Sequence, residues 1–400
     1  MERGLLLAAL LTFAKAYSRG ARLRSPAGTV GTAGAPLSLY DWHRFAMARA
    51  SARGGGRPTT TTITDVARMA DVSPTTVSRV LNGGYPVSAE TRTRVEHAVR
   101  ELSYVRNAHA QALRIASTGL VGVIIHDVAD PFFAEIVAGI QEVAATGQRL
   151  VVLCNSLRDP GSELRYVEML RGQRADAVIL AGGAIGDPHY QQELPQQARW
   201  LRRQGARVIM CGRQMADADA VLPDNRGGAY LLGRYLLGLG HRSIAEISGP
   251  PDFSTTDERS AGLDEALREA GVVRDPHLTV SGHFSRDGGY DAARVLLRSR
   301  SRFTAIFAAN DMMALGALAA LREAGLRVPD DVSLVGYDDL PILRDVVPGI
   351  TTVRVPMREM GRRCMRLAMS ATRRAPRRET LPVELVERES VAPAPARQQV

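Results

Sequence analysis

The stretch from Ile63 to Gly83, ITDVARMADVSPTTVSRVLNG, contains two short helical patterns on either side of one tight corner. Apolar residues share one face of the first pattern and predict a helix over residues 64–70, with an inner side made of Val66, Ala67 and Ala70. The second pattern repeats this spacing with Val77, Val80 and Leu81. Two short amphipathic helices joined in this way predict a helix-turn-helix, whose second helix can enter the major groove of DNA.

The ends of the second helix carry residue types that favour helix boundaries. Ser73 is a natural N-cap, and Pro74 suits the first helical position because an N–H there has no partner within the helix. Asn82, followed by two glycines, ends the helix. A third helix is expected from Ser88 to Leu102, with a buried face made of Val95, Ala98, Val99 and Leu102. The three helices predict a small head with its own core.

The outer side of the second helix carries four polar residues, Thr75, Thr76, Ser78 and Arg79. Hydroxyl groups can reach phosphates or base edges, and Arg79 can bind a guanine through two hydrogen bonds. Generic packing of three helices is the alternative interpretation. The chemistry of the corner favours DNA binding.

Charge is distributed unevenly along the 400 residues, which include 51 basic and 42 acidic side chains. Residues 1–114 and 358–400 are basic, whereas residues 115–357 carry more acidic than basic side chains. A basic head on an acidic body indicates that the head meets a polyanion. Lys15 is the only lysine, so the many arginines also reflect a compositional bias and are weak evidence by themselves.

The three cysteines, Cys154, Cys211 and Cys364, are far apart and lack the spacing of a metal site. We interpret them as small buried residues in a reducing compartment. Nothing in the sequence indicates a cofactor, a metal or a catalytic group: it has no G-x-S-x-G, no Walker A motif and no metal-spaced pair of histidines. An enzyme is therefore disfavoured.

The first 58 residues form a leader that imitates a secretory signal. Leu5–Ala14 is apolar and follows Arg3, and Ala14-Lys-Ala16 resembles a cleavage site, but the apolar run is too short to span a membrane. A secreted sugar-binding protein of a transporter would explain this leader but leaves residues 60–114 without a purpose. We expect a disordered or wrongly assigned leader, with the true start near Met47, and a cytoplasmic protein without a membrane partner.

From Gly119 onward, apolar strands alternate with amphipathic helices. The expected strands are 120–125, 150–153, 177–180, 208–210, 244–247, 305–307 and 333–335. The expected helices include 132–146, 161–171, 226–239, 258–270, 287–299 and 311–324. This alternation predicts an α/β body with parallel sheets, in which ligands bind at the carboxyl ends of strands, and its length favours two lobes.

Polar and aromatic residues follow these strands where that rule places a ligand. They include Asp130, Phe132, Thr255, Arg259, Phe284, Asn310 and Asp338. Taken singly, several of them are also natural helix caps. Together, aromatic rings and an arginine among carboxylates suit a polyhydroxylated ligand such as a sugar or a nucleoside.

Four segments of the head resemble the LacI/GalR family of transcription regulators. They are Thr62-Ile-Thr-Asp-Val-Ala, Val72-Ser-x-x-Thr-Val-Ser-Arg-Val-Leu-Asn82, Val87-Ser-x-x-Thr91-Arg92 and Leu102-x-Tyr104-x-x-Asn107. The resemblance continues to about residue 390. It implies a body of the periplasmic-binding-protein type I arrangement, in which the chain crosses between the lobes near 221, 354 and 385.

The resemblance also implies which residues meet the DNA. A hinge helix over residues 107–116 would fold on the operator, with Leu113 as an apolar wedge in the minor groove and Ala110 small enough for two hinge helices to meet. The implied DNA-contacting set is Thr64, Ser73, Pro74, Thr75, Thr76, Ser78, Arg79, Asn82, Asn107, Ala110 and Leu113.

The resemblance implies that Arg259 forks onto ligand oxygens and Asp338 accepts from hydroxyls. The family's effector positions correspond to Phe132, Thr255, Arg259, Phe284, Asn310 and Asp338. Two departures matter. Many relatives have Asn where this chain has Asp130, and some purine-binding relatives have Arg where it has Phe253. Both departures argue for a neutral sugar rather than an anionic or purine ligand.

These features predict a repressor whose affinity for double-stranded operator DNA is controlled by a small effector. We expect a leader over 1–58, a DNA-binding head over 59–106, a hinge helix over 107–116, an effector-binding and dimerisation domain over 117–390 and a disordered tail over 391–400. Two half-sites need two heads, so a homodimer is expected. Pro393 and Pro395 exclude a tetramer-forming helix at the end of the chain.

Overall fold

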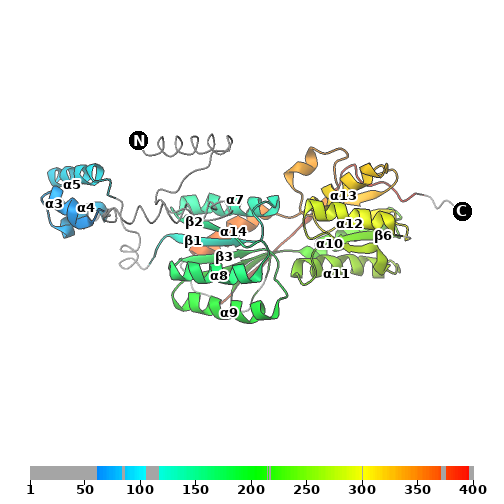
Figure 1. Cartoon of the computed structure of the whole chain (residues 1–400), viewed down its shortest axis with the longest axis horizontal. Coiled ribbons are helices and arrows are strands. Elements are labelled where there is room, and N and C mark those ends of the chain that lie inside the picture. The colour runs from blue at the N-terminus through cyan, green and yellow to red at the C-terminus, as the bar shows by residue number, and fades with distance from the viewer. Residues whose placement is uncertain are drawn as a thin grey trace, which may run out of the picture. The chain divides into compact units, whose positions relative to one another are not determined.

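The computed structural model of the chain describes residues 61–82, 86–104, 117–213, 215, 218–299, 301–370 and 375–395. The chain divides into two compact units, one ending at Val105 and the other beginning at Arg106 (Figure 1). The leader over 1–58 and the hinge helix over 107–116, with Asn107, Ala110 and Leu113, lie outside the described residues. Among the helices of the described ranges, none is long and apolar enough to cross a membrane.

The first unit contains three helices, α3 (Ile63–Met69), α4 (Pro74–Asn82) and α5 (Ala89–Glu101). Thr62 and Asp65 form a reciprocal capping box at the start of α3, and Asp71 turns the corner with a left-handed φ of 50°. The core consists of Val66, Ala67, Ala70, Val77, Val80, Val95 and Ala98. The predicted helix-turn-helix head is confirmed.

The second unit has two lobes, each built on a parallel sheet. The sheet of lobe 1 has six strands in the order β11-β5-β4-β3-β1-β2, and that of lobe 2 has four in the order β7-β6-β8-β9. The strands of lobe 1 are β1 (Leu120–Ile125), β2 (Leu150–Asn155), β3 (Ala177–Ala181), β4 (Arg207–Cys211), β5 (Asp219–Pro223) and β11 (Arg378–Leu381). Those of lobe 2 are β6 (Ile244–Ser248), β7 (Thr279–Ser281), β8 (Ala305–Ala308) and β9 (Ser333–Val335).

Helices cover both faces of each sheet. In lobe 1, α7 (Pro131–Thr146) packs with α14 (Met357–Met369) on one face, and α8 (Pro160–Gly172) packs with α9 (Pro188–Arg203) on the other. In lobe 2, the pairs are α10 (Asn225–Gly238) with α11 (Ser254–Glu269), and α12 (Arg286–Arg298) with α13 (Asp311–Glu323). Residues of strands β1, β3 and β4 alternate between two apolar clusters, because successive side chains point to opposite faces.

The chain passes between the lobes three times. It leaves lobe 1 after β5, returns through β10 (Thr352–Arg354) and leaves again through β12 (Glu384–Val386). β10 and β12 pair as an antiparallel two-stranded ribbon. The carboxyl ends of both parallel sheets therefore face the region that the crossings border, as the α/β prediction required.

The predicted disordered tail is wrong for residues 391–395, which pack on lobe 2. Val391 contacts the core, and the amide of Ala392 donates to Ser333 Oγ over 3.1 Å. His241 Nε2 lies 3.0 Å from the carbonyl oxygen of Ala392, and the amide of Ala394 donates to Leu239 O over 2.8 Å. Two prolines prevent a helix, but they do not prevent an extended segment from bonding to the neighbouring backbone. Residues 396–400 lie outside the described part of the chain.

Candidate ligand-binding cleft and DNA-contacting face

The outer face of α4 carries the residues predicted to read DNA. Thr75 and Arg79 are exposed, and Thr76 and Ser78 are half-buried, whereas Val77 and Val80 face the core. Thr64, Ser73 and Pro74 are exposed as well. These predicted residues therefore lie on the solvent side of the head, and Asn82 is the last residue of α4.

Two of these residues also stabilise the start of α4. Ser73 Oγ accepts from the amide of Thr76 over 3.1 Å and lies 2.9 Å from its hydroxyl. This is N-capping, which satisfies one of the N–H groups that a helix leaves without an internal partner. Ser73 thus has a structural role in addition to its place on the outer face.

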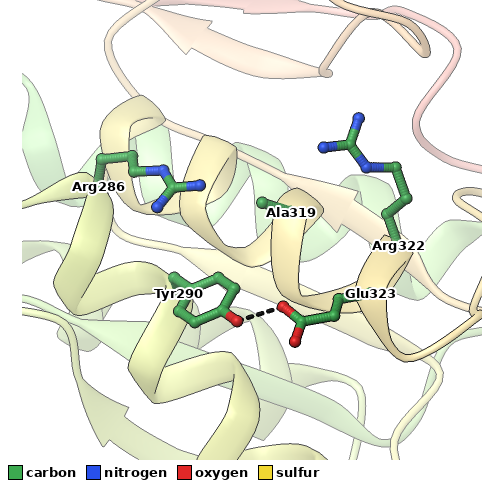
Figure 2. A pocket seen from close by; sticks show the side chains of 5 residues that line it. All are labelled: Arg286, Tyr290, Ala319, Arg322 and Glu323. Carbon is green, nitrogen blue, oxygen red and sulfur yellow. Dashed lines mark hydrogen bonds between the residues drawn. The ribbon is translucent and has the colours of Figure 1, made fainter.

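A shallow pocket of about 530 Å³ lies on the surface of lobe 2, between α12 and α13 (Figure 2). Its lining residues are Arg286, Tyr290, Ala319, Arg322 and Glu323. The Tyr290 hydroxyl donates to Glu323, and the guanidinium of Arg286 lies 5.4 Å from the centre of the Tyr290 ring. None of the predicted effector residues lines this pocket.

All seven predicted effector residues line a second cavity, the cleft, where the carboxyl ends of the two sheets meet. Lobe 1 contributes Asp130 and Phe132, and lobe 2 contributes Thr255, Arg259, Phe284, Asn310 and Asp338. The other lining residues are His126, Phe133, Arg158, Gly182, Gly183, Gly212, Pro223, Asn225 and Phe253. Residues from both lobes thus converge on one site, as the strand-end rule predicts.

The lobe 2 wall of the cleft is built around Arg259. Its Nε donates to Asn225 Oδ1 over 3.0 Å, its Nη1 to the carbonyl of Ala309 over 2.5 Å, and its Nη2 to Asp338 Oδ1 over 3.0 Å. The guanidinium also lies 3.8 Å from the centre of the Tyr337 ring. The resemblance implies an Arg259 side chain that projects into the cleft and forks onto ligand oxygens. It is instead 3% exposed and already holds three acceptors, because α11 carries it inside the lobe.

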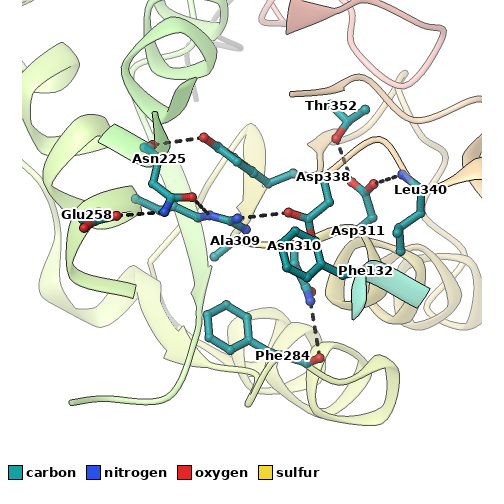
Figure 3. Close-up of polar contacts among 12 residues, drawn as sticks. Phe132, Asn225, Glu258, Phe284, Ala309, Asn310, Asp311, Asp338, Leu340 and Thr352 are labelled. Atoms are coloured by element: carbon teal, nitrogen blue, oxygen red, sulfur yellow. Dashed lines mark hydrogen bonds and ion pairs between the residues drawn. The ribbon is translucent and has the colours of Figure 1, made fainter. Parts of the chain in front are cut away.

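Two further polar side chains of this wall have structural partners. Asn310 caps α13, since its Oδ1 accepts from the amide of Met313 over 2.9 Å, and its Nδ2 lies 3.4 Å from the carbonyl oxygen of Phe284 (Figure 3). Asn225 donates to Glu258 over 2.8 Å. Asn310 therefore both caps a helix and lines the cleft, so the capping interpretation and the ligand-binding interpretation of this residue are compatible.

Carboxylates are concentrated beside this wall. Burial raises the pKa of Asp338 to about 7; Arg259 acts in the opposite direction, and the charge of Asp130 raises the pKa further. Burial also raises the pKa of Asp311 well above its ordinary value, with the charge of Asp338 adding to it. Asp311 accepts from Thr352 Oγ1 and from the amide of Leu340, both over 2.7 Å. The cleft thus combines hydrogen-bond acceptors with one carboxyl group, that of Asp338, which loses its proton near neutral pH.

The lobe 1 wall carries a second arginine–carboxylate group. Asp130 caps α7 by accepting from the amide of Phe132 over 3.1 Å, and Arg158 lies 3.5 Å from Asp130 and 3.3 Å from Asp127. Burial raises the pKa of Asp130, and Arg158 opposes this rise. Each lobe therefore presents one arginine paired with aspartate, which leaves little net positive charge to attract an anion.

A buried polar network lies beneath the lobe 1 wall, and the sequence did not reveal it. His126 Nε2 lies 3.2 Å from Glu163, which also accepts from Arg213 Nη2 over 3.1 Å. Arg213 Nη1 donates to the hydroxyl of Tyr190 over 2.6 Å, and that hydroxyl donates to Glu163. Burial acts to raise the pKa of Glu163, but Arg213 and His126 outweigh it and lower the pKa far below its ordinary value.

Two residues of this network could have been predicted from the sequence. His126 directly follows β1 and Arg213 closely follows β4, so both lie at the strand ends that the parallel-sheet rule marks. Glu163 lies inside α8, where a carboxylate usually faces solvent, and Tyr190 lies in the first turn of α9, a helix that is not among those expected from the sequence. Among the described residues, no cluster of three metal-ligating side chains occurs here or elsewhere.

Comparison with known proteins identifies two regions of the chain. Residues 62–107 match the family described as bacterial regulatory proteins, lacI family, and residues 234–391 match the periplasmic binding protein-like domain. The chain is 36% identical over 338 residues to the HTH-type transcriptional regulator DegA of Bacillus subtilis (strain 168), covering 83% of this chain and 98% of DegA. It is 35% identical to the HTH-type transcriptional repressor PurR of Pectobacterium carotovorum subsp. carotovorum (strain PC1), covering 84% and 98%.

Solved structures give the same result. A lac repressor dimer bound to operator and an anti-inducer superposes with a TM-score of 0.71 at 30% identity, covering 84% of this chain and all of that one. The transcriptional regulator CelR in complex with cellobiose has a TM-score of 0.62 at 35% identity, covering 82% and 99%. The similarity therefore extends over the head and the body together.

Proposed function

Because the chain belongs to the lacI family of bacterial regulatory proteins, we propose that it is a repressor whose affinity for operator DNA is set by a sugar bound in the cleft. DNA-binding transcriptional regulation, rather than catalysis, is the activity of that family. The observation that carries the proposal is the convergence of seven predicted residues on one cavity between the lobes.

The composition of the cleft supports a neutral, polyhydroxylated ligand. Phe132 and Phe284 offer ring faces, and Asp130 and Asp338 offer acceptors for hydroxyl groups. Both arginines of the lining are already paired with carboxylates. Phe253 is buried and packs against His126 with ring centres 5.7 Å apart, so no cation stands at the position that distinguishes some purine-binding relatives.

A thermal-shift screen tests the ligand class. We expect members of a panel of neutral sugars, including cellobiose and D-ribose, to raise the melting temperature of the full chain. Hypoxanthine and guanine are the competing probes, because PurR proteins are among the relatives. Stabilisation by a purine and by no sugar would replace the sugar proposal with a purine one.

The head is proposed to read DNA through α4. Substitution Arg79→Ala is expected to weaken operator binding by about 1–3 kcal/mol and to relax the preference at one base pair, if the guanidinium contacts a guanine. An equal loss on every DNA sequence would make Arg79 a phosphate contact instead.

The proposed domain organisation has a head over 59–106, a hinge helix over 107–116 with Asn107, Ala110 and Leu113 on the DNA, and a sensor from 117.

We also propose that the protein acts as a homodimer in the cytoplasm, where its DNA lies. β2 is an edge strand of the lobe 1 sheet, and its apolar side chains Leu150, Val152 and Leu153 are 65%, 37% and 40% exposed. An exposed apolar edge strand is a surface that proteins normally cover. A second copy related by two-fold symmetry covers it and brings two heads to the two halves of an operator.

A further inference from the structure

The cleft between the lobes is narrow. The space between its side chains is about 50 Å³, small against the roughly 300–1,000 Å³ of typical ligand sites. The lobes also touch directly, since the amide of Ala184 donates to Ser254 Oγ over 2.9 Å and the amide of Ser254 donates to the carbonyl of Ala184 over 3.0 Å. Entry of a sugar therefore requires the lobes to move apart. The strands that cross between the lobes must change conformation in this movement.

The loop after β9 joins the cleft to those strands through two adjacent residues. Asp338 has a φ of 121° and Asp339 a φ of 59°. Both values lie in the left-handed region that residues other than glycine rarely adopt. A backbone held in such a conformation persists only where its surroundings fix it, and such sites often have functional roles. The Asp338 carboxylate bonds to Arg259 in the cleft wall, whereas the Asp339 carboxylate bonds elsewhere.

Asp339 holds both strands of the crossing ribbon. Its Oδ2 accepts from Nε of Arg354, the last residue of β10, over 2.8 Å, and its Oδ1 accepts from Nη2 of Arg388, two residues beyond β12, over 2.5 Å. The Asp339 side chain is 1% exposed. Burial acts to raise its pKa, but the bonds from Arg388 and Arg354 outweigh burial and lower the pKa below its ordinary value. One ionised, buried carboxylate thus joins two of the three crossings.

The backbone reinforces this connection. The amide of Asp338 donates to the carbonyl of Val353 over 2.8 Å, and the amide of Val355 donates to the carbonyl of Asp338 over 3.2 Å. Arg354 also bonds to Glu384 of β12 over 3.1 Å. A shift of the Asp338 loop therefore cannot occur without a shift of β10, because the two share backbone and side-chain hydrogen bonds.

We propose that Asp339 is a positioning residue that couples the cleft to the crossing strands, so that engagement of Asp338 changes the angle between the lobes. The part of this proposal that concerns a bound effector rests on the proposed function. The part that concerns the link between Asp339 and the crossing strands does not. Replacing Asp339 by Asn would remove the charge and leave one acceptor oxygen where Arg354 and Arg388 now bond to two, so the crossing ribbon would loosen while both lobes remain folded.

Hydrogen–deuterium exchange on the full chain, without any ligand, tests the mechanical part. In Asp339→Asn, the amides of β10 and β12 should exchange about tenfold faster, while those of β6 and β8 keep their rates. Asp331→Asn is the matched control. Asp331 also accepts side-chain nitrogens of one arginine, Arg327, over 3.1 and 3.2 Å, but it lies on the surface of lobe 2 away from the crossings.

Equal exchange in the two variants, or faster exchange spread evenly through lobe 2, would overturn the proposal. If Asp339→Asn does not fold, Arg354→Gln decides the question. This change removes one of the two arginines that bond to Asp339, and the Arg354 side chain is 45% exposed. It should raise exchange in both β10 and β12, and rates equal to those of the Asp331→Asn control would overturn the proposal.

The coupling itself is tested with cellobiose and D-ribose as probes. For a probe that binds the unmodified protein and changes its operator affinity, Asp339→Asn should keep probe binding within about threefold and lose most of the change in operator affinity. A full response in Asp339→Asn would overturn the proposal. Failure of both probes to bind the unmodified protein would count against the sugar effector alone, because the exchange experiment needs no ligand.

Discussion

The carboxylate of Asp338 lies 3.0 Å from the guanidinium of Arg259, and both side chains are less than 5% exposed although both line the cleft. The pair joins α11 to the loop after β9, and the ring of Tyr337 lies beneath the guanidinium. Effector recognition and the stability of lobe 2 therefore depend on the same two residues. A ligand that bonds to either one must compete with an existing ion pair.

Substitution Arg259→Ala is expected to cost about 3–5 kcal/mol of folding stability at about pH 8, where Asp338 is ionised in the folded protein, because it leaves that carboxylate buried without its partner. The free energy of unfolding from urea titrations measures this. Arg327→Ala is the control, since Arg327 pairs with Asp330 and Asp331 at a side chain that is 69% exposed. Its expected cost is below about 1 kcal/mol. A similar small cost at Arg259 would show that the buried pair contributes nothing to the fold.

Stability should fall as the pH rises toward neutrality, and Asp338 should be a main cause. Its pKa of about 7 in the folded protein exceeds the ordinary 3.8, so the folded protein binds a proton that the unfolded chain releases between these values. The resulting loss is up to about 1.4 kcal/mol per pH unit. Asp338→Asn removes this titration, so unfolding free energies measured from about pH 4.5 to about pH 8 should depend less on pH. Parallel profiles for the two proteins would contradict the assignment.

The fold could be predicted because its signals are local and periodic. The corner at Asp71, the cap at Ser73 and the apolar spacing around Val77 are enough for the head. In the body, the seven predicted apolar strands match β1, β2, β3, β4, β6, β8 and β9 in position, and all of them except β2 are buried. Helices α9 and α14 are not among the expected helices; in α9, Pro195 lies inside the helix and the outer face is rich in glutamine and arginine.

The cleft was predictable as a list of residues but not as a geometry. Strand ends identify Arg259 and Asp338, yet no sequence pattern shows that the two bond to each other inside lobe 2. The same limit applies to Glu163, whose partner His126 is 37 positions away in the chain. Contacts between distant segments depend on how whole elements pack, which periodicity does not encode.

Dimerisation through the β2 edge predicts a specific defect. Leu150→Glu places a charge on an apolar edge that a second copy would cover, so it should weaken the dimer roughly tenfold or more. Val273→Glu is the control, because Val273 is 93% exposed on lobe 2, away from the edge strand. Analytical ultracentrifugation measures both. Equal dimer stability in the two variants would mean that β2 is not the interface.

The end of the chain should contribute to stability rather than to assembly. Deleting residues 391–400 removes the four hydrogen bonds made by the backbone of Ala392 and Ala394, at about 1 kcal/mol for each. Deleting residues 396–400 alone leaves these contacts intact. Thermal unfolding should therefore separate the two truncations, with the same dimeric mass for both. Identical melting temperatures would contradict the packed placement of residues 391–395.

The central claim, that a small molecule in the cleft controls DNA binding by the head, is tested most directly by fluorescence anisotropy. The full chain is titrated onto an operator selected from random DNA, with and without the sugar that gives the largest thermal shift. The account predicts a change in operator affinity of about tenfold or more, of the size that allosteric coupling commonly has, and its loss in Asp338→Asn. Tight sugar binding that leaves operator affinity unchanged would contradict the account.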